Sequence, residues 1–167
     1  IVLIWSFGPH SGAHFNPVVS LIFWFKKIIS LSDLVAYVFF QIIGAIFGCL
    51  AANIIFGLPV ITISTHVRHD LSQFLSEILA TFGLVLVIFL AREVARQNIP
   101  ILVGSYIASA YWFSSSTSFA NPAVTIARQF SDTFTGISPS GIPSFVLAQI
   151  FGAILGYIVV QLLSREL

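Results

Sequence analysis

Two Asn-Pro pairs are the residues of this sequence best suited to a chemical role. Asn16 and Pro17 stand in the stretch SGAHFNPVVS, and Asn121 and Pro122 stand in SFANPAVTIAR. Proline suits the first turn of a helix, where its missing N–H would be unpaired anyway, and asparagine is a favoured cap just before that turn. Each pair therefore predicts the start of a helix, tipped by a side-chain amide that can donate and accept hydrogen bonds.

The two helices predicted after these pairs are too short to cross a membrane. Residues 16–26 and 121–130 are apolar, but they have about half the length of a crossing, which needs about 20 helical residues. We expect both to enter the membrane and stop, after non-helical segments that are buried in protein or line water.

Two such helices that meet from opposite faces of the membrane would make a selective pore. Their N-termini carry the positive ends of the helix dipoles, which repel cations. A neutral solute could accept hydrogen bonds from the amides of Asn16 and Asn121. The pattern predicts a passive channel for water and small uncharged solutes that excludes protons and ions.

The composition places the chain in a membrane. Of the 167 residues, 57% are hydrophobic and 8% are charged, and the mean hydropathy is +1.01, whereas an average soluble domain has about 25% charged residues. The net charge is +1 and no basic run is longer than Lys26-Lys27, so nucleic acid is not expected as a partner. The single cysteine, Cys49, excludes a disulfide framework within the chain. No residue pattern calls for a cofactor.

The hydropathy predicts an all-α membrane protein with several spans. The predicted spans are residues 34–57, 72–91, 99–117 and 142–163. The opening IVLIWSFG is too short for a crossing and lacks the basic region of a signal peptide. We expect it to be the last part of a further span whose beginning lies outside this sequence.

The chain contains an internal duplication. Asn16–Ser20 matches Asn121–Thr125 at an offset of 105 residues, and Gln41–Gly48 matches Gln149–Gly156 at an offset of 108. Two matches in the same order at nearly one offset indicate repeated units within one transmembrane domain, 1–167.

The first repeat is a remnant over residues 1–57, and the second covers 72–167. An odd number of spans in each repeat gives the two repeats opposite orientations in the membrane, the inverted-repeat plan of many transporters. This plan collects Lys26, Lys27, Arg92, Arg96 and Arg165 on one side, and leaves Arg68 and Arg128 on the other. The side with five basic residues is predicted to be cytoplasmic.

The paired Asn-Pro boxes, the repeated QI-GAI-G stretch and Glu77 within a span resemble the aquaporin and glycerol-facilitator family, also called major intrinsic proteins. The resemblance covers the whole chain. It implies six spans and two half-helices in a complete subunit, and usually four subunits, each with its own pore. It further implies that Glu77 and His14 support the re-entrant loops through hydrogen bonds, although an intramembrane acid could also contact solute.

The sequence departs from this family at several pore positions. The first box reads Asn-Pro-Val, with Val18 where alanine is usual, and Val124 stands where most members have a filter arginine. Arg128 lies four residues further on, about 5.4 Å nearer the outer mouth on the same helix face. It either lines that mouth or faces lipid and solvent.

Two further filter positions of the family fall on Ser109 and Ser118, and the fourth falls outside this sequence. Two serines and Val124 would make a wider constriction than an aromatic residue, a histidine and an arginine. The resemblance therefore favours glycerol, urea or neutral metalloid hydroxides as solutes, as in bacterial members associated with arsenic handling. The short loops favour a bacterial inner membrane.

Other interpretations stay open at this point. The protein could be a strict water channel, the asparagines could be ordinary helix caps, or the chain could be an inactive truncated fragment. A more distant alternative is an intramembrane metalloenzyme with His10, His14 and Glu77 as ligands. Four-residue spacing brings two imidazoles together only on a helix, and the stretch GPHSG predicts a loop. The sequence thus favours a channel over an enzyme.

Overall fold

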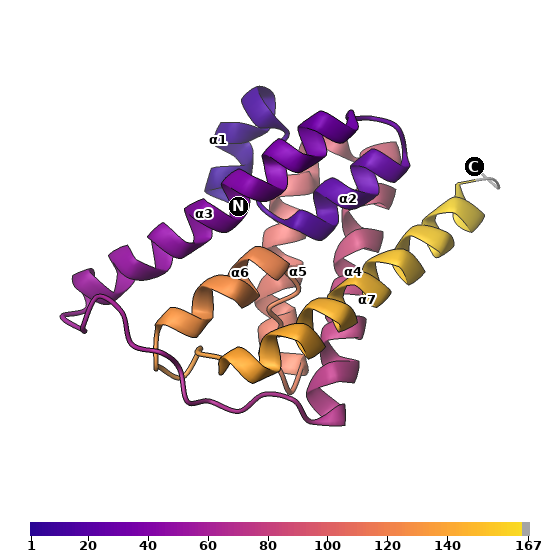
Figure 1. The fold of residues 1–167 in the computed structure, drawn as a ribbon. Coiled ribbons are helices and arrows are strands. Elements are labelled where there is room, and N and C mark those ends of the chain that lie inside the picture. The colour runs from indigo at the N-terminus through magenta and orange to yellow at the C-terminus, as the bar shows by residue number, and fades with distance from the viewer. Residues whose placement is uncertain (165–167) are drawn as a thin grey trace.

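The computed structural model of the protein describes residues 1–164, which form helices joined by loops, with no strand among them (Figure 1). The α-helices are α1 (Val2–Ser11), α2 (Pro17–Phe25), α3 (Leu31–Ile55), α4 (Leu71–Val94), α5 (Ile99–Phe113), α6 (Pro122–Ala127) and α7 (Ile142–Leu163). Short 3₁₀ turns are η1 (Arg96–Asn98), η2 (Arg128–Phe130) and η3 (Pro139–Gly141). Three helices, α3, α4 and η3 with α7, are long and apolar enough to cross a membrane.

The predicted spans are confirmed as helices, with one difference at the third. The span predicted over 99–117 ends at Phe113, because the N–H of Thr117 donates to the carbonyl of Ser114 at 3.2 Å and closes a turn. The residues after Phe113 therefore begin the second re-entrant loop, which covers residues 114–121.

Both Asn-Pro pairs start short helices. The Asn16 side chain accepts a hydrogen bond from the N–H of Val18, and the Asn121 side chain accepts from the N–H of Ala123, at 3.1 and 3.0 Å. In each helix the proline occupies the first turn. The two helices, α2 and α6, diverge from the middle of the bundle toward opposite ends (Figure 1). This is the inverted arrangement expected from the repeat.

The prediction of a loop at GPHSG, residues 8–12, is wrong for all of these residues except Gly12. Helix α1 continues through Pro9 and ends only at Gly12, which has a left-handed φ of 70° and donates its N–H to the Gly8 carbonyl. Proline removes its own hydrogen bond but does not end the helix, whereas glycine adopts the left-handed conformation at little cost. His10 is consequently helical, and His14 follows in the first re-entrant loop, residues 12–16.

The tightest packing joins α4 to α7. A Cβ atom on Gly152 would meet the Ile78 carbonyl, and one on Gly156 would meet the Phe82 carbonyl at 2.9 Å, so these glycines let the two backbones approach closely. Their repeat counterparts in α3, Gly44 and Gly48, have no heavy atom within 4 Å of such a Cβ. The same sequence pattern is therefore packed in the second repeat and open in the first.

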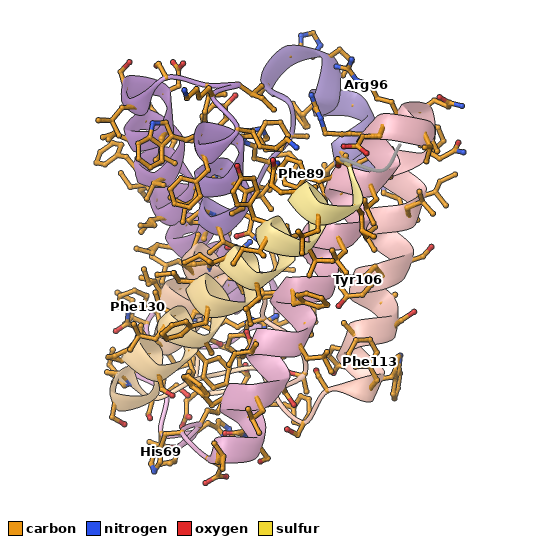
Figure 2. All side chains as sticks on the ribbon, turned by 90° about the vertical axis from the view of Figure 1, so that its right-hand side faces the viewer. His69, Phe89, Arg96, Tyr106, Phe113 and Phe130 are labelled. Atoms are coloured by element: carbon orange, nitrogen blue, oxygen red, sulfur yellow. The ribbon has the colours of Figure 1, made fainter. Side chains whose placement is uncertain are left out.

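The basic residues mark two ends of the bundle. Arg96 lies at the end of the bundle where α4 finishes, and His69 lies at the opposite end, where α4 begins (Figure 2). The turn after α2, with Lys26 and Lys27, lies at the Arg96 end (Figure 1). Arg165, which the sequence also assigns to this side, lies outside the described residues.

Candidate functional site

The two re-entrant loops are joined by a reciprocal pair of hydrogen bonds. Asn16 Nδ2 donates to the Ala120 carbonyl at 2.7 Å, and Asn121 Nδ2 donates to the Phe15 carbonyl at 2.8 Å. The amide oxygens already cap α2 and α6, so each side chain uses both of its polar atoms. An amide nitrogen carries two hydrogens. Among residues 1–164, the second N–H of each asparagine has no acceptor.

Both re-entrant loops use the same unusual backbone. The residues four, three and one before each asparagine have positive φ: Gly12 (70°), Ala13 (47°) and Phe15 (49°), and Thr117 (61°), Ser118 (50°) and Ala120 (46°). Five of these six are not glycine, and such conformations cost about 1–3 kcal/mol each unless the surroundings hold them. The left-handed residue just before each asparagine is the one whose carbonyl accepts the opposite amide.

A cavity of about 150 Å³ contains both asparagines. Its polar lining includes Asn16, Asn121 and His14, and the rest is mainly apolar, with Val19 and Phe23 from α2. Side chains of α1, α4 and α5 complete the wall. A small cavity with a mainly apolar lining and a few hydrogen-bonding side chains suits a small neutral molecule.

Glu77 is fully buried and holds the second re-entrant loop. One carboxylate oxygen accepts from Ser116 Oγ at 2.6 Å and from the N–H of Phe119 at 2.8 Å. The other accepts from the N–H of Ala120 at 2.8 Å and from Gln149 Nε2 at 2.6 Å. The carboxylate thus accepts four hydrogen bonds, three from the second re-entrant loop and one from α7.

Two glutamines reveal a feature that the sequence analysis missed. Gln149 Nε2 also donates to Thr125 Oγ1 at 2.8 Å, and in the first repeat Gln41 Nε2 donates to Ser20 Oγ at 3.0 Å. Each glutamine thus binds the hydroxyl residue four positions after the repeated asparagine. The signal was present, because the glutamine and the hydroxyl residue recur in both matched stretches.

His14 lies in the first re-entrant loop, beside the cavity. Its Nδ1 is 3.0 Å from Ser20 Oγ, and its ring lies 4.0 Å from the ring centroid of Phe23 and 4.9 Å from that of Tyr37. It therefore contacts α2 and α3 at once.

The filter positions are only partly brought together. Val124 and Arg128 line one cavity of about 610 Å³, and Val124 and His14 line another of about 510 Å³. Ser118 is half-buried, and its N–H donates to Ser116 Oγ at 3.1 Å. Ser109 is exposed on α5, and its hydroxyl donates to the carbonyl one turn before. The roles of these serines at a constriction stay predictions.

Arg68 is a further residue that the sequence did not indicate as part of the site. It is buried in the loop between α3 and α4, and it donates to the carbonyls of Gly136, Ser116 and Phe134 at 2.7, 3.1 and 2.7 Å. Desolvation lowers the pKa of its guanidinium from the ordinary value. No local pattern distinguishes this arginine from a solvent-facing one.

The described residues offer no metal centre. Within 1–164, no group of three or more His, Cys, Asp or Glu side chains could hold a metal ion. Gly12 separates His10 from His14 by ending α1, and Glu77 is occupied by its four donors.

The chain is similar in sequence to a family of known proteins. The family model described as "Major intrinsic protein" matches residues 1–116. The chain belongs to the major intrinsic protein family. This membership confirms the resemblance read from the Asn-Pro boxes, and it places the chain in a family of channels and not among enzymes.

Relatives within the family come from bacteria, animals and plants. The chain is 49% identical to "Aquaglyceroporin AqpS" of Rhizobium meliloti (strain 1021) over 154 residues, which cover 92% of this chain and 66% of that protein. It is 32% identical to "Aquaporin-4" of Notomys alexis, over 90% of this chain and 44% of that protein. It is 35% identical to "Aquaporin NIP1-1" of Arabidopsis thaliana over 59% of this chain and 35% of the relative. The chain thus spans less than two thirds of the length of these relatives.

Proposed function

We propose that this chain forms the pore region of a passive channel for water and small uncharged solutes in a bacterial inner membrane. The observation that carries the proposal is the reciprocal bonding of Asn16 and Asn121, which leaves one N–H of each amide free at a shared cavity. Family membership and the 49% identity to a bacterial aquaglyceroporin support it. The lipid bilayer and the permeating solutes are then the main partners.

The same arrangement is suited to excluding protons and cations. A water molecule that accepts hydrogen bonds from both asparagines turns its two hydrogens outward, and this orientation interrupts proton hopping along a water file. The N-terminal ends of α2 and α6 point toward this level of the pore and add positive potential there.

The solute range follows from the side chains at the filter positions. Val124 has no hydrogen-bond donor, and the proposed partners Ser109 and Ser118 are small. A constriction of this kind admits glycerol, urea and neutral metalloid hydroxides as well as water. The aquaglyceroporin name of the bacterial relative fits this range.

We assign loop support to Glu77 and His14. The four hydrogen bonds of Glu77 hold the second re-entrant loop, and His14 holds the first through Ser20 and the ring of Tyr37. Because all four donors of Glu77 come from the protein, its carboxylate has little capacity left for a solute.

The two repeats form one domain. The repeat also explains why one face of α3 is open. Gly152 and Gly156 of α7 pack against α4. The equivalent Gly44 and Gly48 of α3 would allow another helix to pack closely on α3 in the same way. In the complete protein this would be a span of the first repeat. Four such subunits, each with its own pore, would then form the homotetramer that the resemblance implies.

Transport by liposomes tests the proposal. The full-length natural protein is reconstituted, and the vesicles are mixed with excess glycerol or urea while light scattering is followed. Vesicles with the protein should shrink and then reswell about tenfold faster than empty vesicles, because the solute is spared the cost of entering lipid without hydrogen bonds. Empty vesicles are the control for lipid leakage. Asn98→Ala, which alters an exposed asparagine that makes no cap hydrogen bond, should transport like the unchanged protein.

The alternatives give different traces. Rapid shrinkage without reswelling would identify a strict water channel. Shrinkage and reswelling at the rates of empty vesicles would contradict the proposal.

A further inference from the structure

Arg128 and Phe119 form a pair whose place in the fold is repeated on the other side of the pore. At the offset of 105 residues, Phe119 corresponds to His14 and Arg128 corresponds to Phe23. The rings of His14 and Phe23 lie 4.0 Å apart, and the Arg128 Cζ atom lies 4.2 Å from the centroid of the Phe119 ring. The two equivalent pairs of positions are thus both in contact. The contact joins two rings in the first repeat, and a cation and a ring in the second.

The repeat also indicates what Arg128 faces. Val19 and Phe23 line the cavity that contains both asparagines. Their counterparts, Val124 and Arg128, line a separate cavity of about 610 Å³, whose lining includes neither asparagine and whose other walls come mainly from α3 and residues 131–135. Since α2 and α6 are related by inversion, the face of α6 with Val124 and Arg128 is the outer equivalent of the pore face of α2.

The Arg128 guanidinium is held in place without using its N–H groups. Arg68 donates three hydrogen bonds to carbonyls, whereas among residues 1–164 none accepts a hydrogen bond from the Arg128 guanidinium. The described residues also contain no carboxylate paired with it. Its position comes from the Phe119 ring, a contact that attracts a cation to the ring face.

Phe119 is itself fixed. Its ring is buried and packs edge-on against Phe145 at 5.2 Å, and its N–H donates to Glu77. The Arg68 guanidinium also lies over this ring, at 5.2 Å. A fixed ring therefore holds a guanidinium that lines the cavity and that has no ion-paired carboxylate among residues 1–164, and a second guanidinium lies over the same ring.

We propose that Arg128, held on Phe119, is the specificity residue that excludes cations at the outer half of the pore, in place of a charged residue at Val124. This inference rests on the proposed function. The charge stands one helical turn outside Val124, so it acts by electrostatic repulsion without narrowing the level of Val124. The channel can then be wide enough for polyols and still exclude cations.

The experiment compares two solutes of the same planar shape, urea and the guanidinium ion. Liposomes containing the full-length protein are mixed with either solute, with potassium inside and valinomycin present to carry the compensating charge. The wild type should take up urea and not guanidinium. Arg128→Leu should raise guanidinium uptake about tenfold, because the repelling charge is gone, and change urea uptake less than about twofold.

Three variants keep the test decisive if Arg128→Leu folds poorly. Arg128→Lys retains the charge and the contact with the ring, so guanidinium should stay excluded. Phe119→Leu keeps the arginine but removes its support, so guanidinium uptake should rise. The double variant Val124→Arg with Arg128→Leu returns a charge to the other position, so it should again exclude guanidinium and should slow glycerol.

The outcomes separate this inference from the proposed function. Guanidinium exclusion in Arg128→Leu equal to that of the wild type, with urea uptake intact, would overturn the role of Arg128 and leave the channel in place. Urea and water uptake at the level of empty vesicles in the wild type would overturn both.

Discussion

Gln149 donates its side-chain amide to the Glu77 carboxylate at 2.6 Å, and this bond joins α7 to α4 within the membrane. The same carboxylate accepts two backbone N–H groups from the second re-entrant loop, at Phe119 and Ala120. A single buried acid thereby connects two long helices to the segment that positions Asn121. The position of that asparagine depends on this connection.

Replacing Glu77 by glutamine should destabilise the fold. The new amide group would place a donor against two of the four existing donors, and each buried donor left without an acceptor costs about 1–3 kcal/mol. We expect a loss of about 2–5 kcal/mol in the free energy of unfolding. Unfolding in mixed micelles with increasing denaturing detergent measures this.

The control for this variant is Glu93→Gln. Glu93 is exposed and, among residues 1–164, accepts only from Ser164 Oγ, a bond that an amide oxygen can still accept. We expect a change below about 0.5 kcal/mol, the range of ordinary surface substitutions. Equal stability of Glu77→Gln and Glu93→Gln would contradict the loop-holding role of Glu77.

Substituting serine for Asn121 separates capping from pore chemistry. Serine also caps helices well, so α6 should keep its first turn, and the free energy of unfolding should fall only by about 0.5–1.5 kcal/mol for the lost bond to Phe15. The bond to the Phe15 carbonyl and the free N–H at the cavity would be lost. Water permeability per channel should fall about tenfold, because losing one hydrogen bond of about 1.4 kcal/mol changes a rate by about that factor.

Stopped-flow light scattering on liposomes gives this permeability, and thermal unfolding of the same preparation gives the stability. Full water permeability in Asn121→Ser would contradict the pore role and leave Asn121 with structural roles, as the cap of α6 and as a donor to the Phe15 carbonyl.

Adding a methyl group at Gly152 should disrupt the contact between α4 and α7. The new Cβ would meet the Ile78 carbonyl, which cannot move without distorting α4. Gly152→Ala should therefore cost about 1–3 kcal/mol, the range of overpacked cores. Denaturation in micelles measures the effect.

The repeat provides a matched substitution at Gly44, which has free space at the same position. In this 167-residue chain, Gly44→Ala should be neutral or stabilise by up to about 1 kcal/mol, because alanine favours a helix more than glycine does. A greater cost for Gly44→Ala than for Gly152→Ala would show that the two helix faces are not packed as described.

Acidification should loosen the loop between α3 and α4. Asp132 accepts from the N–H and the hydroxyl of Thr65, at 2.8 and 3.1 Å, and the backbone hydrogen bond is the main cause that lowers its pKa below 3.8. A lowered pKa in the folded state means that this tether is complete above the unfolded-state pKa. It is lost as the pH falls through the folded-state value.

Hydrogen exchange of residues 60–68 at pH 6 and at acid pH checks this sign. The wild type should gain exchange on acidification, after correction for the intrinsic rate. Asp132→Asn cannot titrate, so its corrected exchange should not depend on pH in this range. Acid-induced opening of the same size in both proteins would assign the change to another group.

Several features of the protein follow from short stretches of sequence. Asparagine followed by proline determined where α2 and α6 begin, because capping and a free first-turn N–H are local properties. Uncharged runs determined α3 and α7 within a few residues, since the length of an apolar helix is set by the bilayer. The repeat of Asn16 at Asn121 indicated the duplication, and the odd number of spans in each repeat predicted the inverted plan.

Local patterns were weaker where two signals competed. At Gly8 and Pro9 the residue types suggested a loop, but the helix continued until the left-handed Gly12. The predicted span ran past the end of α5 into the uncharged polar residues 114–117, because Ser-Ser-Ser-Thr can form either a final helical turn or the start of a re-entrant loop.

Only the tertiary structure decided which partners the functional side chains find. Asn16 meets the carbonyl of Ala120, 104 residues away, because left-handed residues in both loops turn those carbonyls toward the opposite asparagine. Arg128 rests on Phe119 and Arg68 binds three loop carbonyls, although both arginines look alike in the sequence. Periodicity and propensity report the conformation of a segment, whereas contacts across a hundred residues depend on how all segments pack at once.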